Sequence, residues 1–211
     1  MDFSELISQV VSSSDWKLHE RAGKQWGSLD ALLNTRNSFR VIIPQGQAAR
    51  PYHASVALEI SRNLFQYFAA DSEISLDSSV SNTTTGNHIL LGFPDEFGIA
   101  THNRGVEFPI SKSVDAIFLR DASGRRRRYP IEPGMGLAYL YPLPCERLGL
   151  VLWGADEAGL RAVSRLLPLR TGVGQPDFFL VGKEAGWGGV GGVRALGMFG
   201  FSWQISPAAY L

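Results

Sequence analysis

The stretch RLGLVLWGADEAGLRAVSRLLPLRTGVGQPDFFLVGKEAGWGGVGG, residues 147–192, decides the fold class. It opens with a near-continuous apolar run at 148–153, which is typical of a strand covered on both faces. Asp156 follows at the position of a helix N-cap, where its carboxylate can accept the free amide hydrogens of a first helical turn. Apolar residues then recur at helical spacing up to Pro168, and residues 178–181 form a second apolar strand. Two apolar strands joined by one amphipathic helix predict a right-handed βαβ unit.

A similar alternation of strand and helix precedes this stretch. The pattern predicts a strand at 39–43, a helix from Pro51 to about residue 70, and strands at 73–76 and 88–91. Leu58 and Phe65 widen the apolar face of the helix, so we expect the helix to be mostly covered. These segments predict a second βαβ unit in the same sheet.

The middle of the chain has shorter strands joined by turns. Strands are predicted at 106–110, 116–119 and 137–141, with a β-hairpin over 116–131, which indicates an antiparallel extension of a parallel sheet. Residues 1–36 show helical spacing and few strand signals, so we expect a helical segment that packs on the sheet. The prediction is an α/β fold, a three-layer Rossmann- or flavodoxin-like mostly parallel sheet with an antiparallel extension and N-terminal helices. Residues 37–211 form the α/β domain, in one structural unit with residues 1–36.

Composition narrows the classes of function. The chain has 211 residues, 45% hydrophobic and 19% charged, with a formal net charge of zero, so no overall field recruits nucleic acid or an anionic membrane. No apolar run approaches the roughly 20 residues of a membrane span. The first residues, MDFSELISQVV, include acids and no basic segment, so they do not predict a signal peptide. Cys145 is the single cysteine, which excludes an intrachain disulfide and a multi-cysteine zinc site.

Familiar catalytic and cofactor patterns are missing from the sequence. A serine hydrolase on an α/β scaffold needs Gly-x-Ser-x-Gly, and no such pattern occurs. The glycine-rich run at 186–192 follows the last predicted strand, where neither a Walker loop nor a dinucleotide loop belongs. We therefore predict no catalytic, cofactor-binding or metal-binding residue. The chain's histidines lack metal-ligand spacing; they are His19, His53, His88 and His102.

Several polar residues follow predicted parallel strands. Because ligands of doubly wound folds gather outside the carboxyl ends of the strands, these residues mark where a crevice would form. Capping of the next helix explains Asp156 equally well. The possible crevice residues are Gln45, His53, Asp95, Glu96 and Asp156.

Two further features have alternative interpretations. Arg125, Arg126, Arg127 and Arg128 are consecutive, which is typical of a charged edge strand that resists edge-to-edge pairing, although a local anionic partner would also suit them. Asn82-Thr-Thr is a glycosylation sequon if the chain is secreted.

Beyond these patterns, the chain resembles the C-terminal region of large fungal secreted proteins of the prolyl-oligopeptidase-like α/β-hydrolase group. The residues that carry the resemblance are Gly154-Ala-Asp156, Leu167-Pro-Leu-Arg-Thr-Gly172, Pro176-Asp177 and Trp187-Gly-Gly-Val-Gly-Gly192, with Trp26-Gly and Leu90-Leu-Gly-Phe-Pro94 upstream. In that family the nucleophile lies in a preceding domain, so no catalytic residue carries over. The resemblance implies an excised domain whose partner is the preceding hydrolase domain of the same parent chain.

The expected function is therefore a non-catalytic C-terminal accessory domain of a larger serine hydrolase, packing on or bounding the catalytic domain. Two alternatives stay open. One is a stand-alone hydrolase that uses Asp95, Glu96 or His53 at the strand ends. The other is a glycan- or protein-binding module that uses exposed aromatic residues; the candidates are Trp16, Trp187 and Trp203.

Overall fold

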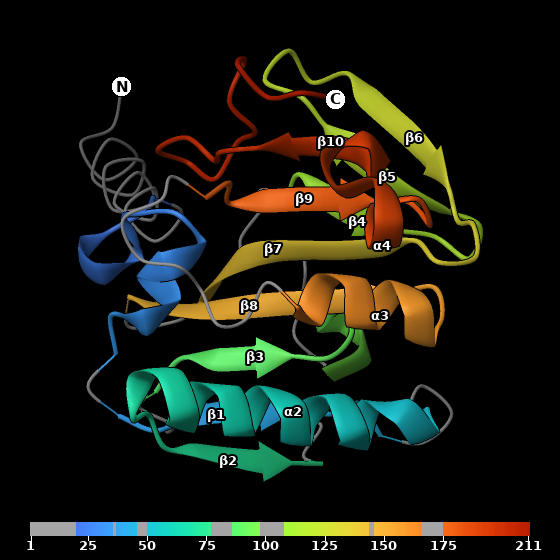
Figure 1. Cartoon of the computed structure of the whole chain (residues 1–211). Coiled ribbons are helices and arrows are strands. Elements are labelled where there is room, and N and C mark those ends of the chain that lie inside the picture. Colours follow the sequence, from blue (N-terminus) through green and yellow to red (C-terminus); the bar gives the residue numbers. More distant parts are fainter. Residues whose placement is uncertain are drawn as a thin grey trace, which may run out of the picture.

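The computed structural model describes residues 20–35, 37–45, 50–76, 86–97, 108–143, 146–165 and 175–211 (Figure 1). A seven-stranded mixed sheet has the order β10-β9-β7-β8-β3-β1-β2. Its strands are β1 (Phe39–Ile42), β2 (Ser72–Ser75), β3 (His88–Leu90), β7 (Gly136–Leu143), β8 (Arg147–Gly154), β9 (Phe178–Val181) and β10 (Val193–Gly197). A separate antiparallel sheet contains β4 (Ile110–Lys112), β5 (Ala116–Arg120) and β6 (Arg126–Pro130). The α-helices are α2 (Pro51–Phe68), α3 (Glu157–Ser164) and α4 (Ala185–Gly188), and the 3-10 helices are η2 (Gly23–Gln25), η3 (Leu29–Leu33), η5 (Pro94–Phe97) and η7 (Gly189–Gly192).

One half of the large sheet is parallel, as predicted for the whole sheet. β2, β1, β3 and β8 are parallel neighbours, and α2 connects β1 to β2 as a βαβ unit. Pro51 occupies the first turn of α2, where its missing N–H leaves no helical hydrogen bond unmade. The expected coverage of α2 is wrong in part, because Leu58 and Phe65 are 63% and 66% exposed. Val56 and Leu64, on the face toward the sheet, are fully buried.

The predicted βαβ unit over 147–192 contains an inserted strand. β8, α3 and β9 occur in the expected order, but β7 lies between β8 and β9 and is antiparallel to both. Only three residues separate β7 from β8, and so short a connection permits only antiparallel pairing. β8 and β9 consequently run in the same direction without touching. α3 ends at Ser164, and Pro168 lies outside the described residues.

α3 packs on β7 and β8 through direct backbone contact. A Cβ on Gly159 of α3 would overlap the Met135 carbonyl oxygen, and a Cβ on Gly136 of β7 would overlap the Gly159 carbonyl oxygen. These glycines therefore let the helix approach the strands more closely than any larger residue would allow. Val163, also on α3, is fully buried against this face.

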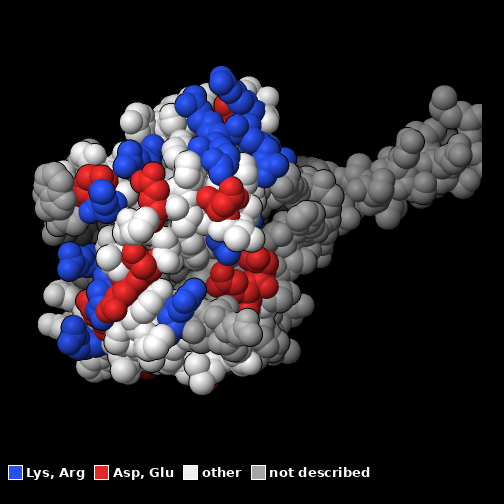
Figure 2. Space-filling view, turned by 90° about the vertical axis from the view of Figure 1, so that its right-hand side faces the viewer, with Lys and Arg blue, Asp and Glu red and all other residues white. Residues whose placement is uncertain are grey.

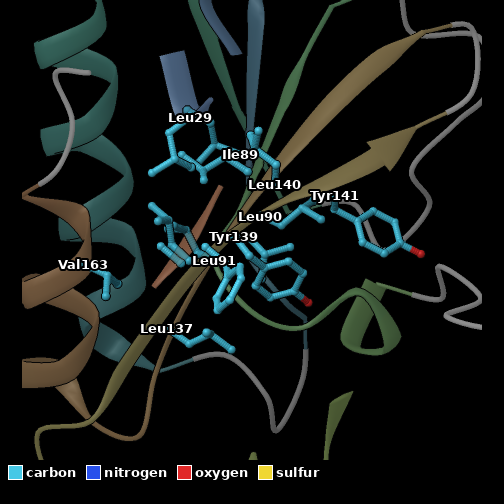
Figure 3. Packing of buried hydrophobic residues seen from close by; sticks show 14 of the residues in the cluster. Leu29, Ile89, Leu90, Leu91, Leu137, Tyr139, Leu140, Tyr141 and Val163 are labelled. Carbon is cyan, nitrogen blue, oxygen red and sulfur yellow. The ribbon is translucent and has the colours of Figure 1, made fainter. Parts of the chain in front are cut away.

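The two faces of the sheet have different covers. Residues alternate along β7, so Gly136 faces α3 and Tyr139 faces the other way. The Tyr139 ring lies 6.0 Å from Phe93 and 5.6 Å from Phe108, measured between centroids, and Phe108 leads into β4. Figure 1 shows α2 and α3 in front of the large sheet and the β4–β5–β6 sheet behind it. Figure 3 shows Ile89, Leu90, Leu140 and Tyr139 among the buried residues of this core.

The α/β class is confirmed, and the finer prediction needs adjustment. The described helices α2 and α3 lie on one face, so a three-layer Rossmann- or flavodoxin-like arrangement is not confirmed. The expected antiparallel extension is present in β7, and the predicted hairpin over 116–131 is present as β5 and β6. The hairpin belongs to a separate three-stranded sheet, and β10 was not predicted. Of the predicted N-terminal helical segment, residues 1–19 lie outside the described residues, and only the short 3-10 helices η2 and η3 follow. Within the described part of the chain, no helix has the length and apolarity to cross a membrane.

Candidate functional site

The residues predicted to mark a crevice follow the carboxyl ends of β1, β3 and β8. These strands are mutually parallel, so the segments that follow them reach the same edge of the sheet. Each segment contributes one side chain of interest: His53 from the first turn of α2, Glu96 from η5, and Asp156 from the turn before α3. The structure thus brings these three predicted residues to one edge.

Tyr52, which sequence reasoning missed, lies among them. Burial raises the pKa of its hydroxyl, and the negative charges of Asp156, Glu157 and Glu96 raise it further, whereas Arg50 opposes them. Its ring lies 4.9 Å from the His53 ring, measured between centroids. A tyrosine in the first turn of a helix carries no sequence signal of its own, and only the assembled edge identifies it.

Glu96 connects this edge to the second sheet. Its carboxylate lies 3.4 Å from the Lys112 ammonium of β4, and that ammonium lies 5.4 Å from the centre of the Phe93 ring. Burial raises the pKa of Glu96, the Lys112 charge opposes the rise, and Asp95 adds to it. Asp95 itself is exposed beside Glu96. The arrangement gives a half-buried carboxylate with a cationic partner.

The remaining predicted residues are engaged in local hydrogen bonds. Asp156 caps α3 as predicted, because Oδ1 accepts from the Gly159 amide at 2.9 Å and Oδ2 from the Gly134 amide at 2.8 Å. The Nδ1 atom of buried His53 accepts from the Arg50 amide at 2.7 Å, so Nε2 carries the proton of the neutral ring. Burial lowers the pKa of His53.

Gln45 follows β1 and lies at the same edge of the sheet, beside the end of β2. Its amide nitrogen donates to the Leu76 carbonyl just beyond β2. The predicted residues therefore lie along one edge of the sheet, with Gln45 toward β2.

A polar cleft lies at the opposite edge of the sheet, where sequence reasoning predicted nothing. It has a volume of about 790 Å³ and lies at the amino ends of β1, β2 and β3. Phe39 and Phe68 contribute apolar surface to it. Its polar lining includes Thr35, Asn37, Arg40, Asp71, Glu73 and His88. The general rule for doubly wound sheets places ligands at the other edge, so this cleft could not be found from strand order.

His88, on the cleft wall, lies in a basic environment. Its Nε2 atom lies 3.4 Å from the Arg147 Nη1 atom, and both residues are buried. Burial, reinforced by the guanidinium groups of Arg147 and Arg40, lowers the pKa of His88 to about 4. The imidazole is therefore neutral near pH 7. Arg40 also pairs with Glu73 across β1 and β2 at 3.4 Å.

Of the aromatic residues proposed for glycan binding, only Trp203 has a described side chain. Trp203 is buried, and the Arg21 guanidinium lies 4.8 Å from the centre of its ring, so the prediction that it is exposed is wrong. Trp16, Asn82 and the Trp187 side chain lie outside the described residues. Trp26 is 47% exposed and lies 5.7 Å from the Phe201 ring. Among the described residues, no group of three or more His, Cys, Asp or Glu side chains could hold a metal ion.

Comparison with known proteins gives one informative relative. No protein-family model matches the chain. The chain is 39% identical over 204 residues to an uncharacterized secreted protein of Arthroderma benhamiae, a match that includes 93% of this chain and 21% of that protein. The chain thus spans about a fifth of the length of this curated relative. The expected similarity to a large secreted fungal protein is confirmed, and the relation to prolyl oligopeptidases stays a prediction.

Proposed function

We propose that this chain is a non-catalytic accessory domain of a larger secreted protein of the serine-hydrolase, prolyl-oligopeptidase-like type. In this role it packs on the catalytic domain or bounds its substrate cleft. The length of the secreted relative supports the proposal, because a protein about five times longer offers other domains to contact. The observation that carries it is an exposed apolar surface on α2 and β2, the outermost strand of the large sheet.

This α2–β2 surface consists of Leu58, Phe65, Ile74 and Leu76. Their exposed fractions are 63%, 66%, 36% and 63%. Leu58 and Phe65 lie three residues before and four residues after Ser61, so all three share one side of α2. The side chain of Ser72 in β2 donates to the Ser61 hydroxyl at 2.7 Å, which places that side of α2 next to β2.

β2 contributes apolar side chains and is the outermost strand of the large sheet among the described residues. Ile74 lies two residues after Ser72 and therefore points to the same face of the sheet. Exposed apolar side chains beside an outermost strand favour association with another surface. A neighbouring domain of the same parent chain would cover both.

The carboxyl-edge residues also fit a structural role. Asp156 accepts a hydrogen bond in the first turn of α3, and His53 accepts one in the first turn of α2. Glu96 pairs with Lys112. A hydrolase at this edge would need these groups for substrate, whereas their present bonds hold the segments after β1, β3 and β8 together.

A photo-crosslinking experiment tests the docking. A photoreactive amino acid replaces Phe65 in the full-length protein that carries this domain. We expect crosslinks to segments outside residues 1–211. The control position is Val114, which is 99% exposed and lies between β4 and β5, in the other sheet. Equal crosslinking from both positions would contradict the docking surface. Serine-dependent cleavage of p-nitrophenyl esters or prolyl peptides by the purified domain would contradict its non-catalytic character.

A second candidate, a ligand-binding module, is favoured by the cleft at the amino ends of the strands. Its lining of hydroxyl, amide, carboxylate and guanidinium groups beside Phe39 and Phe68 suits a neutral sugar better than an apolar ligand. Calorimetry tests this candidate by measuring the affinity of cell-wall oligosaccharides for the unmodified domain and for the variant Asn37→Ala. Binding that is unchanged in the variant, or undetectable in the parent, would eliminate it.

A further inference from the structure

We propose that the solvent-facing side of the β4–β5–β6 sheet binds an anionic polysaccharide through arginine side chains. The binding face, called here the arginine face, consists of Arg120, Arg126 and Arg128 around Phe118. This site is separate from the α2–β2 surface and from the cleft, so it is independent of the proposed accessory role.

Strand register places the arginines together. Arg126 of β6 lies directly opposite Arg120 of β5, and Arg128 lies opposite Phe118. Directly paired residues of antiparallel strands project to the same side. The intervening residues Ile117 and Leu119 are fully buried, so the arginines lie on the solvent side. Figure 2 views the side of the molecule on which β6 lies and shows Lys and Arg side chains gathered in its upper part.

Basic side chains outnumber acidic ones in this sheet. Residues 110–130 contain six basic and two acidic side chains, although the whole chain has a formal net charge of zero. Asp121 is used within the turn, where its Oδ1 accepts from the Ser123 amide at 2.9 Å and the Arg125 amide at 3.0 Å. Asp115 pairs with Arg128, and both side chains are more than half exposed. The local excess of positive charge therefore stays at the surface.

The guanidinium groups of Arg126 and Arg128 supply the chemistry of this face, because both side chains are exposed on β6. Guanidinium forks bind sulfate and carboxylate groups with two hydrogen bonds each, and they retain their charge at any ordinary pH.

The local geometry favours a polysaccharide over other polyanions. The Arg126 guanidinium lies 4.5 Å from the centre of the Phe118 ring and covers its outer face, so this ring offers no platform for stacking a nucleobase. Consecutive arginines and Pro130 on the edge strand β6 oppose addition of a peptide strand. Arg126 and Arg128 repeat at about 7 Å along β6, which suits a polymer with regularly spaced charges. The relative of this chain is a secreted protein, and extracellular polyanions include such polysaccharides.

The test measures binding of heparin, a sulfated polysaccharide, and of polygalacturonate, a carboxylated one. We expect binding at low salt that weakens steeply as salt rises. The double variant Arg126→Gln with Arg128→Gln should lose affinity at least about tenfold. A matched control, Arg62→Gln with Arg165→Gln, removes the same charge from two exposed sites on α2 and after α3, and should change affinity less than about twofold.

A further pair, Arg126→Lys with Arg128→Lys, keeps the charge and the fold while removing the guanidinium forks. We expect it to bind more weakly than the parent and more tightly than the glutamine variant. The proposal is overturned if neither polysaccharide binds, or if the control loses as much affinity as the arginine-face variant. It is also overturned if poly-glutamate or single-stranded DNA binds these arginines as tightly as the polysaccharides do.

Discussion

The Arg21 guanidinium and the Asp177 carboxylate form a buried ion pair across 156 positions of sequence, with Nη1 2.8 Å from Oδ2. The same carboxylate oxygen accepts from the Phe199 amide at 2.7 Å, and Arg21 donates to the carbonyls of Phe199 and Gly27. The pair therefore ties the segment before β1 to the start of β9 and to the C-terminal loops. Burial raises the pKa of Asp177, and the Arg21 charge and the Phe199 amide oppose that rise.

Replacement of Asp177 by Asn should destabilise the domain by about 3–5 kcal/mol, because it leaves the Arg21 charge buried without its counter-ion. Urea unfolding measured at neutral pH gives this difference. The comparison variant is Glu157→Gln, which breaks an exposed ion pair with Arg161 and should cost less than about 1 kcal/mol. Similar losses for both variants would show that burial does not control the strength of these pairs.

The domain should lose stability as the pH falls from about 6.5 to about 4. In the unfolded chain His88 takes up a proton near pH 6.5, whereas in the fold burial and the nearby Arg147 and Arg40 charges lower its pKa to about 4. The unfolded state therefore binds more protons in this window, so the free energy of unfolding decreases with falling pH. Protonation of His88 accounts for a loss of about 3 kcal/mol in the free energy of unfolding once the pH is below about 4.

The variant His88→Gln isolates this contribution, because the other titrating groups are common to both proteins. Urea titrations at pH 7 and pH 4 should show a smaller fall for the variant than for the parent. Parallel curves for the two proteins would be inconsistent with a neutral buried His88.

Asp156→Ala should cost about 1–2 kcal/mol, because it removes the cap of α3 and the bond to the Gly134 amide. Chemical unfolding measures the loss. Ser28→Ala provides the control, since Ser28 precedes η3 without a side-chain cap bond and its hydroxyl donates to Asp30. An effect of Asp156→Ala no larger than that of Ser28→Ala would contradict the capping role.

Gly159→Ala should destabilise the domain by about 1–3 kcal/mol although alanine favours helix formation. The new methyl group would overlap the Met135 carbonyl oxygen and force α3 away from β7. Thermal unfolding should show a lower midpoint for Gly159→Ala. Gly191→Ala is the control, because nothing lies within 4 Å of its added methyl group. If Gly159→Ala left the midpoint unchanged, close packing of α3 would not depend on this glycine.

Local patterns predicted individual elements well. The apolar run at 148–153, the N-cap Asp156 and Pro51 at the start of α2 each depend on neighbours within one or two turns, and each occurs as expected. The partner of each strand was harder to predict. β7 is as apolar as β8, so its composition does not reveal that it separates β8 from β9.

The candidate site was predicted in part for a similar reason. Parallel strands bring Glu96 and Asp156 to one edge, which strand order alone indicates. Tyr52 belongs to that edge only because α2 begins there. The cleft at the amino ends and the burial of Trp203 depend on how distant segments close over the sheet.

The sequence by itself determined the α/β class, the strands and helices from β1 to β3 and from β7 to β9, and the starts of α2 and α3, because hydrophobic periodicity and capping act over a few residues. Only the tertiary structure decided that β7 enters the large sheet, that Arg21 meets Asp177, and that the arginines of β6 face solvent with Arg120. These arrangements depend on which surfaces bury each other across the whole chain, and that competition has no local signature.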